Sequence, residues 1–178
     1  MSIRRVVTGH SMKKAVIVSD GPPPKVLTFH AIPGSVSALL WQTASPPSVP
    51  HEGEAVSGSS SLVPALGESR LVVITFPPDS VMASPEFDPV AAGREAMAKM
   101  PEMASRLEPD SPGMHTTDTV DYAIVLDGEV SLEVDDGQQV HLKPHDIVVQ
   151  NGTRHGWRNK TGNPATVAFV LIGANRDG

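Results

Sequence analysis

Short runs in which aliphatic or β-branched residues alternate with polar residues recur along the chain, and they are most regular after Gly113. Turn residues such as Asp127-Gly128 separate these runs. Alternation with a period of two, interrupted by Gly, Pro and Asp, predicts β-strands. The strands expected in this part of the chain are 122–126, 129–134, 138–142, 147–150, 155–159 and 166–172. Short strands at this spacing predict a sandwich or a barrel, and therefore an all-β fold.

The first 112 residues carry weaker versions of the same pattern. The expected elements are a strand pair at 4–7 and 15–18 joined by a polar turn at 8–14, two strands at 25–29 and 35–43, and one at 70–76. Residues 44–69 are rich in Ser, Pro, Gly and Glu and predict a long mobile loop with little to bury. This part of the chain is expected to form an N-terminal β arm and additional elements beside the barrel.

One helical segment interrupts the strands, at about 88–107. Asp88 followed by Pro89 supplies a side-chain cap and a proline in the first turn, and Ala, Met, Glu and Lys dominate the residues that follow. Pro101 lacks the N–H that a helix interior needs. We therefore expect a kink or two short helices.

Length and charge limit the possible functions. A chain of 178 residues is long enough for one domain with a sizeable core, in which 1–112 pack on the barrel strands of 113–178. A net charge of -6 disfavours nucleic acid and anionic membranes as partners. There is no cysteine, no apolar run of about 20 residues and no signal-peptide core at the N-terminus. We expect a soluble, unprocessed cytoplasmic protein that binds a small molecule.

Polar residues at odd positions inside two of the strands are the candidate chemistry. His115, Thr117 and Asp121 fall on one face of their segment, and His155 and Trp157 share a face of theirs. If both segments line one barrel, two imidazoles and one carboxylate can converge. That set suits a mononuclear metal site with open positions.

The turns and polar positions together resemble the cupin superfamily. His115, Asp121 and Gly128 match the first cupin signature, and the second signature is matched by Pro144, Asp146, Gly152, His155 and Asn159. The resemblance covers about 113–173 and implies a jelly-roll barrel, also called a double-stranded β-helix. It is strongest with small single-domain cupins found in aromatic-polyketide and related pathways.

The departures from the signatures concern the metal site. Thr117 stands where the family has a second histidine, and Asp121 stands where it has a longer glutamate. The resemblance then implies one divalent metal, Fe, Zn, Ni or Mn, held by His115, Asp121 and His155. Asp121 has an alternative role as a partner that orients a histidine. Thr117 and Trp157 are expected to line the pocket, and Trp157 fits a core position equally well.

Several functions remain open at this point. The leading hypothesis is a metal-dependent enzyme that dehydrates, isomerises or aromatises a carbonyl-bearing, polyketide-like metabolite, with His115 and Asp121 as catalytic residues. The same ligands with Fe(II) and oxygen give a dioxygenase. A non-catalytic small-molecule-binding protein is a further alternative, and sugar-nucleotide epimerisation is a weaker one because no arginine cluster is visible.

The opposite face of the first signature strand is apolar, with Tyr122, Ile124 and Leu126. Such a face on a small barrel needs a cover, and the candidates are residues 70–76 or a second subunit. We therefore expect a homodimer.

Overall fold

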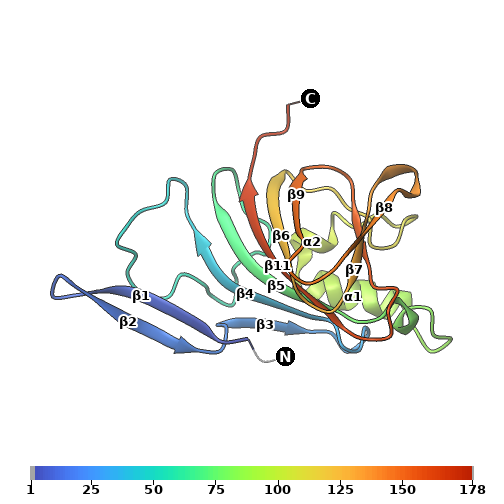
Figure 1. Ribbon diagram of the computed structural model, residues 1–178, viewed down its shortest axis with the longest axis horizontal. Coiled ribbons are helices and arrows are strands. Elements are labelled where there is room, and N and C mark those ends of the chain that lie inside the picture. The colour runs from blue at the N-terminus through green and yellow to red at the C-terminus, as the bar shows by residue number, and fades with distance from the viewer. Residues whose placement is uncertain (1–2, 178) are drawn as a thin grey trace.

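The computed structural model describes residues 3–177 and has two short helices beside eleven β-strands, which confirms the all-β prediction (Figure 1). The strands are β1 (Arg5–Ser11), β2 (Lys14–Gly21), β3 (Lys25–Thr28), β4 (Val36–Thr43), β5 (Ser69–Phe76), β6 (Thr119–Asp127), β7 (Val130–Glu133), β8 (Gln139–Leu142), β9 (Ile147–Asn151), β10 (Gly156–Arg158) and β11 (Ala165–Gly173). The helices are α1 (Pro89–Lys99) and α2 (Pro101–Ala104), and single 3₁₀ turns are η1 (Asp79–Val81) and η2 (Asp135–Gly137).

The strands form three antiparallel sheets. A six-stranded sheet has the order β3-β4-β5-β11-β6-β9, a three-stranded sheet has the order β10-β7-β8, and β1 pairs with β2 alone. The six-stranded sheet takes strands from both sides of residue 112, so β4 and β5 are part of the barrel wall. The expectation that 70–76 cover the outer face of β6 is wrong, because those residues form β5 within the same sheet.

A hydrophobic core fills the space between the six-stranded and three-stranded sheets. Along β6 and β11 its buried members alternate with residues that point outward, as strand geometry requires. The buried residues of the whole core are Ala123, Val125, Val130, Leu142, Ala165, Val167 and Phe169. Tyr122 and Leu126 point the other way and are exposed. The prediction that Tyr122 and Leu126 lie on the face opposite to Asp121 is therefore correct, and the inner face also carries the apolar Ala123 and Val125.

The helical segment divides where the sequence predicts. The Asp88 side chain accepts hydrogen bonds from the N–H groups of Val90 and Ala91, which caps α1. Met100 leaves the helical region, and α2 begins at Pro101. Glu95 of α1 accepts hydrogen bonds from the backbone of His30 and Ala31, so the helix is fixed beside the end of β3.

Two predictions for the N-terminal region are wrong in detail. The strands of the first hairpin continue through the polar residues 8–11, and only Met12 and Lys13 form the turn, both with positive φ. The segment 44–68 is a loop, yet it buries Val56 and Leu62 against Leu39 and Val72. These apolar residues of the loop therefore pack on β4 and β5.

No helix among residues 3–177 combines the length and the apolar character needed to cross a bilayer.

Gly128 provides a test of this packing. It has a φ of +70, and an added Cβ would lie 2.5 Å from the Pro164 carbonyl oxygen and 2.8 Å from the Ala165 Cα. We expect Gly128→Ala to lower the free energy of unfolding by about 2–4 kcal/mol through strain and overpacking. Gly137→Ala is the matched control, since its φ is +69 and no atom lies within 4 Å. Urea denaturation measures both; equal losses would show that the clash with β11 is unimportant.

Candidate active site

Two imidazoles meet where the chain enters β6 and β10. The N–H of His115 donates to the carbonyl of His155 at 2.9 Å, and the N–H of His155 donates to the carbonyl of His115 at 3.0 Å. Directly paired residues of antiparallel strands place their side chains on the same side. The ring centroids are accordingly 4.3 Å apart. Both side chains are buried.

The flanking segments are held together beside this pair. Leu107 forms a bridge with His115 on the side opposite to His155. The Arg154 guanidinium donates to both carboxylate oxygens of Glu108, at 2.7 and 2.6 Å. Such a bidentate pair fixes orientation as well as distance. These contacts hold the segment before β6 against the segment before β10 on both sides of the imidazoles.

Each imidazole is held in a single tautomer. Nδ1 of His115 lies 3.1 Å from the Gly113 carbonyl, and Nδ1 of His155 lies 3.0 Å from the Thr153 carbonyl. A carbonyl oxygen only accepts hydrogen bonds, so each Nδ1 carries a proton. In the neutral ring the lone pair is then on Nε2. Histidines that bind metals are commonly oriented in this way.

Both rings are held neutral. Burial lowers the pKa of His155 to about 4, and the neighbouring His115 ring contributes to the same shift. Burial also lowers the pKa of His115, against smaller opposing effects of the Gly113 carbonyl and of Glu108. Two adjacent imidazoles therefore present basic nitrogens at neutral pH.

Asp121 lies on the inner face of β6 in an environment that opposes its ionisation. Burial raises the pKa of its carboxyl group to about 6, and a hydrogen bond from Thr119 lowers it by less. The Thr119 hydroxyl is in turn 2.8 Å from that of Thr117. Oδ1 of Asp121 is buried and has no hydrogen-bond partner within residues 3–177. A buried carboxyl with a free oxygen is a typical feature of a catalytic acid or base.

The predicted metal ligands are only partly brought together. Within the described residues 3–177, no three His, Asp or Glu side chains are grouped so that they could hold a metal ion. His115 and His155 are adjacent, whereas Asp121 is not grouped with them. The short aspartate side chain instead reaches the hydroxyl of Thr119.

The predicted pocket residues have mainly structural contacts. Thr117 is buried, and its hydroxyl is paired with that of Thr119. Trp157 packs in the core, with ring centroids 5.3 Å from Phe169 and 6.1 Å from Phe76. Its ring also meets His155 edge-on at 6.3 Å. Trp157 therefore supports the imidazole pair from the side of the core.

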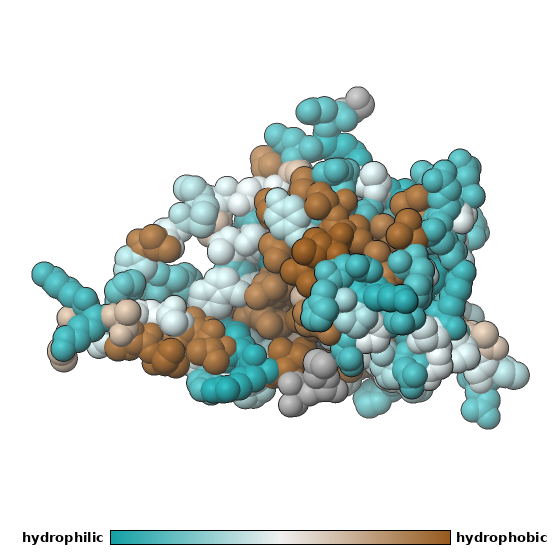
Figure 2. All heavy atoms as spheres, viewed as in Figure 1, coloured by the Kyte–Doolittle hydropathy of each residue, from teal (hydrophilic) through white to brown (hydrophobic). Residues whose placement is uncertain are grey.

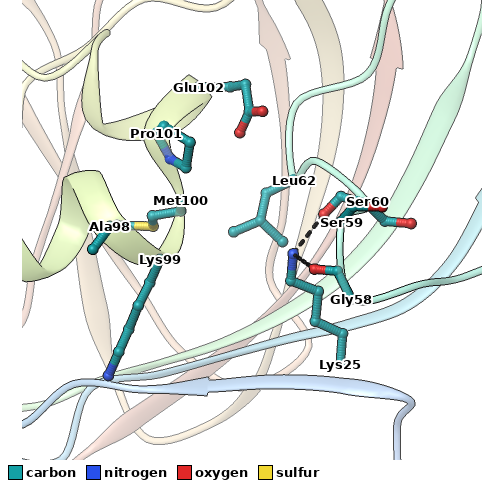
Figure 3. A pocket seen from close by; sticks show the side chains of 10 residues that line it. All are labelled: Lys25, Gly58, Ser59, Ser60, Leu62, Ala98, Lys99, Met100, Pro101 and Glu102. Atoms are coloured by element: carbon teal, nitrogen blue, oxygen red, sulfur yellow. Dashed lines mark hydrogen bonds between the residues drawn. The ribbon is translucent and has the colours of Figure 1, made fainter.

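Two cavities lie outside this site. One of about 190 Å³ lies between the helices and the loop at 58–62, where the Lys25 ammonium donates to the carbonyls of Gly58 and Ser60 (Figure 3). The other, of about 370 Å³, lies between β1 and the sheet, beside Trp41 and Leu71. Neither is lined by the imidazole pair or by Asp121.

Two residues of the site were missed in the sequence. Thr119 hydrogen-bonds Asp121, and Gln150 of β9 lies directly opposite Asp121 and is buried. Thr119 shares the parity of Thr117 and Asp121, which is a signal that the sequence contains. The position of Gln150 depends on the pairing of β6 with β9, which the sequence does not contain.

Comparisons with known proteins agree with this architecture. Residues 105–172 match the family model described as "Cupin domain". The chain is 35% identical over 83 residues to the cupin-domain-containing oxidoreductase fogC of Aspergillus ruber, covering 45% of this chain and 39% of the relative. It is 50% identical over 48 residues to phomopsin biosynthesis cluster protein C' of Diaporthe leptostromiformis, covering 27% of this chain and 25% of the relative. The matches thus span about a quarter to two fifths of those relatives.

A solved structure, a cupin superfamily protein of Desulfitobacterium hafniense, is also similar. Its sequence identity is 13%, its TM-score is 0.37, and the alignment covers 59% of this chain and 67% of that one.

The raised pKa of Asp121 predicts a pH-dependent stability. The unfolded carboxyl releases its proton near its ordinary pKa of 3.8 and the folded one only near 6, so the stability of the native state falls as the pH rises through this window. We expect Asp121→Asn to remove this loss. The variant should match the parent near pH 4 and exceed its free energy of unfolding by about 3 kcal/mol at pH 7.

Urea denaturation from pH 4 to pH 8 makes the measurement, with the exposed Asp127→Asn as control. Parallel curves for the parent and Asp121→Asn would contradict the burial of an unfavourable charge at this position.

Proposed function

We propose that this chain, whose residues 105–172 match the cupin domain model, is a cupin enzyme that moves protons on a carbonyl-bearing small molecule. The relatives named as proteins of phomopsin and oryzines biosynthesis clusters support a substrate from secondary metabolism. Dehydration, isomerisation or aromatisation of a polyketide-like compound fits this chemistry.

The observation that carries the proposal is the state of Asp121. Its carboxyl has a pKa of about 6 and a buried Oδ1 without a partner. A general base works best when its pKa is close to the working pH, and burial brings Asp121 nearer to neutrality than an ordinary aspartate.

This proton transfer needs no co-reactant. Ionised Asp121 takes a proton from the carbon next to the substrate carbonyl, and the electron pair of that C–H bond delocalises onto the carbonyl oxygen. In a dehydration, a hydroxyl at the β carbon then leaves and receives the proton from Asp121, which releases water. In an isomerisation, Asp121 returns the proton to a different carbon of the enolate.

The imidazole pair is the part of the chain that would hold the divalent metal expected for the family. The neutral rings, with Nδ1 tied to carbonyls and Nε2 unprotonated, suit that role. When bound, such an ion would supply a Lewis acid for the enolate oxygen. Two protein ligands are fewer than the three that are usual for catalytic zinc, so modest affinity is expected.

A second candidate function is an oxidation that consumes molecular oxygen. It is favoured by the names of three relatives, which are called cupin-domain-containing oxidoreductases. Oxygen uptake during turnover distinguishes it from proton transfer, which consumes none.

The proposed role of Asp121 is tested by proton exchange. Incubated in D₂O with a panel of 1,3-dicarbonyl compounds, the protein should accelerate deuterium incorporation next to the carbonyl, as followed by NMR. The rate should rise with pH through a pKa near 6. Asp121→Asn should reduce it by about 10²–10⁴-fold, and the exposed Tyr122→Phe should leave it unchanged. An Asp121→Asn variant as fast as the parent would exclude the proposed base.

Metal binding is tested separately by calorimetric titration with Zn²⁺ or Ni²⁺ at pH 7. We expect His115→Ala and His155→Ala each to weaken binding at least about tenfold, while Asp121→Asn retains it. An equal loss in Asp121→Asn would identify the aspartate as a third ligand. Unchanged binding in both histidine variants would place the ion elsewhere.

A further inference from the structure

Gln150 lies opposite Asp121 on the inner face of the six-stranded sheet. The two residues are directly paired in the register of β6 and β9, so their side chains point to the same side, with Cβ atoms about 5 Å apart. Both are buried, with 4% of Gln150 and 5% of Asp121 exposed. The outer surface over these strands is hydrophobic, with Tyr122 and Val149 exposed on it (Figure 2). A buried polar pair thus lies behind an apolar outer surface.

The orientation of the Gln150 amide is fixed by Thr153. Its Nε2 donates to the Thr153 carbonyl at 3.4 Å and also hydrogen-bonds the Thr153 hydroxyl. A carbonyl oxygen only accepts hydrogen bonds, so the nitrogen of the amide, and not its oxygen, faces Thr153. The same carbonyl lies 3.0 Å from Nδ1 of His155. One backbone oxygen therefore positions both the amide of Gln150 and the imidazole of His155.

Two acceptor oxygens of this pair have no donor. Oδ1 of Asp121 and Oε1 of Gln150 accept no hydrogen bond from residues 3–177. Both N–H bonds of the Gln150 amide are directed to Thr153, so the amide does not donate to Asp121. A buried acceptor without a donor costs about 1–3 kcal/mol. A donor group of a bound molecule would remove this cost at both oxygens.

The surroundings favour a neutral hydroxyl group as that donor. Leu171 lies on the other side of Asp121, and the next inward pair along the strands is Ala123 with Val148. A charged group would lose its hydration among these apolar side chains. A hard metal ion takes about six or more oxygen ligands, whereas this pair supplies only two. A hydroxyl needs one acceptor for its proton and keeps its own lone pairs for a second hydrogen bond.

The turn that follows Gln150 is anchored to the segment before Asp121. β9 is an edge strand of the sheet and pairs with β6 alone. Beyond its end, the Arg176 guanidinium donates to the carbonyls of Gly152 at 2.9 Å and of Thr117 at 3.0 Å. This bridge holds the end of the edge strand against β6. The Gln150 oxygen is therefore fixed relative to Asp121 before a ligand binds, which reduces the entropy cost of binding.

We propose that Gln150 selects β-hydroxycarbonyl compounds as substrates, because its Oε1 accepts a hydrogen bond from the hydroxyl group that later leaves. Asp121 then faces the lone pairs of the same hydroxyl oxygen. This inference rests on the proposed function for the fate of the hydroxyl group. It narrows the reaction from proton transfer in general to dehydration.

The two side chains have separate tasks in this dehydration. Ionised Asp121 takes the proton from the α carbon, and the electron pair moves onto the carbonyl oxygen. The C–O bond at the β carbon then breaks, its electron pair stays with the hydroxyl oxygen, and that oxygen takes the proton back from Asp121. An unsaturated carbonyl compound and water result. Gln150 exchanges no proton; it holds the hydrogen of the hydroxyl so that a lone pair is directed toward Asp121.

A ketone that cannot react tests the selection without turnover. The probe is an aryl β-hydroxyketone whose α carbon carries methyl groups in place of its protons, and the reference is the same ketone with hydrogen in place of the hydroxyl. In NMR titrations the parent should bind the hydroxyketone at least about tenfold more tightly. The side-chain amide signal of Gln150 should shift with the hydroxyketone alone. Equal affinities for the two ketones would overturn the proposal.

Variants of Gln150 separate hydrogen-bond acceptance from a structural role. Gln150→Met has a similar volume but no oxygen, so the preference for the hydroxyketone should fall below about threefold. Gln150→Glu keeps an acceptor, loses the N–H groups that bind Thr153, and should retain the preference. The exposed Gln138→Met is the matched control and should behave as the parent does. Loss of the preference in both Gln150 variants would show that the residue only supports Thr153, and the selective role would be wrong.

Turnover separates this inference from the proposed function. With a β-hydroxyketone that has α protons, Gln150→Met should lower kcat/KM for enone formation at least about tenfold. Deuterium exchange next to the carbonyl of the ketone without a hydroxyl should change by less than about twofold. Equal losses in both reactions would contradict the selective role. A parent that catalyses no exchange would reject the proposed function, whereas the affinity ratio of the unreactive ketones would still decide the role of Gln150.

Discussion

The backbone pairing of His115 with His155 is the constraint on which the rest of the site depends. His115 leads into β6 of the six-stranded sheet, and His155 leads into β10 of the three-stranded sheet. Two reciprocal hydrogen bonds thus join the two walls of the barrel at one point. The same geometry sets the imidazoles side by side. Fold and candidate chemistry share this contact, and the ion pair of Arg154 with Glu108 secures it.

Burial then sets the chemistry of the titratable groups. It lowers the pKa of both histidines and raises that of Asp121, because each environment disfavours the charged form. The result is two neutral bases and a weak acid in one small domain. This arrangement reduces stability at neutral pH, which is a common property of residues kept for function.

The outer surface follows from the same strand geometry. Side chains alternate along a strand. Because Asp121 and Ala123 of β6 point inward, their neighbours Tyr122 and Ile124 point outward. A strand with apolar side chains on both faces is suited to being covered on both faces. In β6 this chain covers only the inner face. The open outer face of β6 is thus a consequence of this alternation.

The sequence alone determined the approximate positions of the strands from 122 onward, the cap of α1 at Asp88 and the break before Pro101. These follow from local rules of periodicity, capping and proline geometry. Only the tertiary structure decided that Asp121 is not grouped with the imidazoles, that Gln150 lies beside it, and that residues 70–76 join the sheet instead of covering it. Those outcomes depend on which strands pair and in which register, and pairing between distant segments is not encoded in the periodicity of either segment by itself.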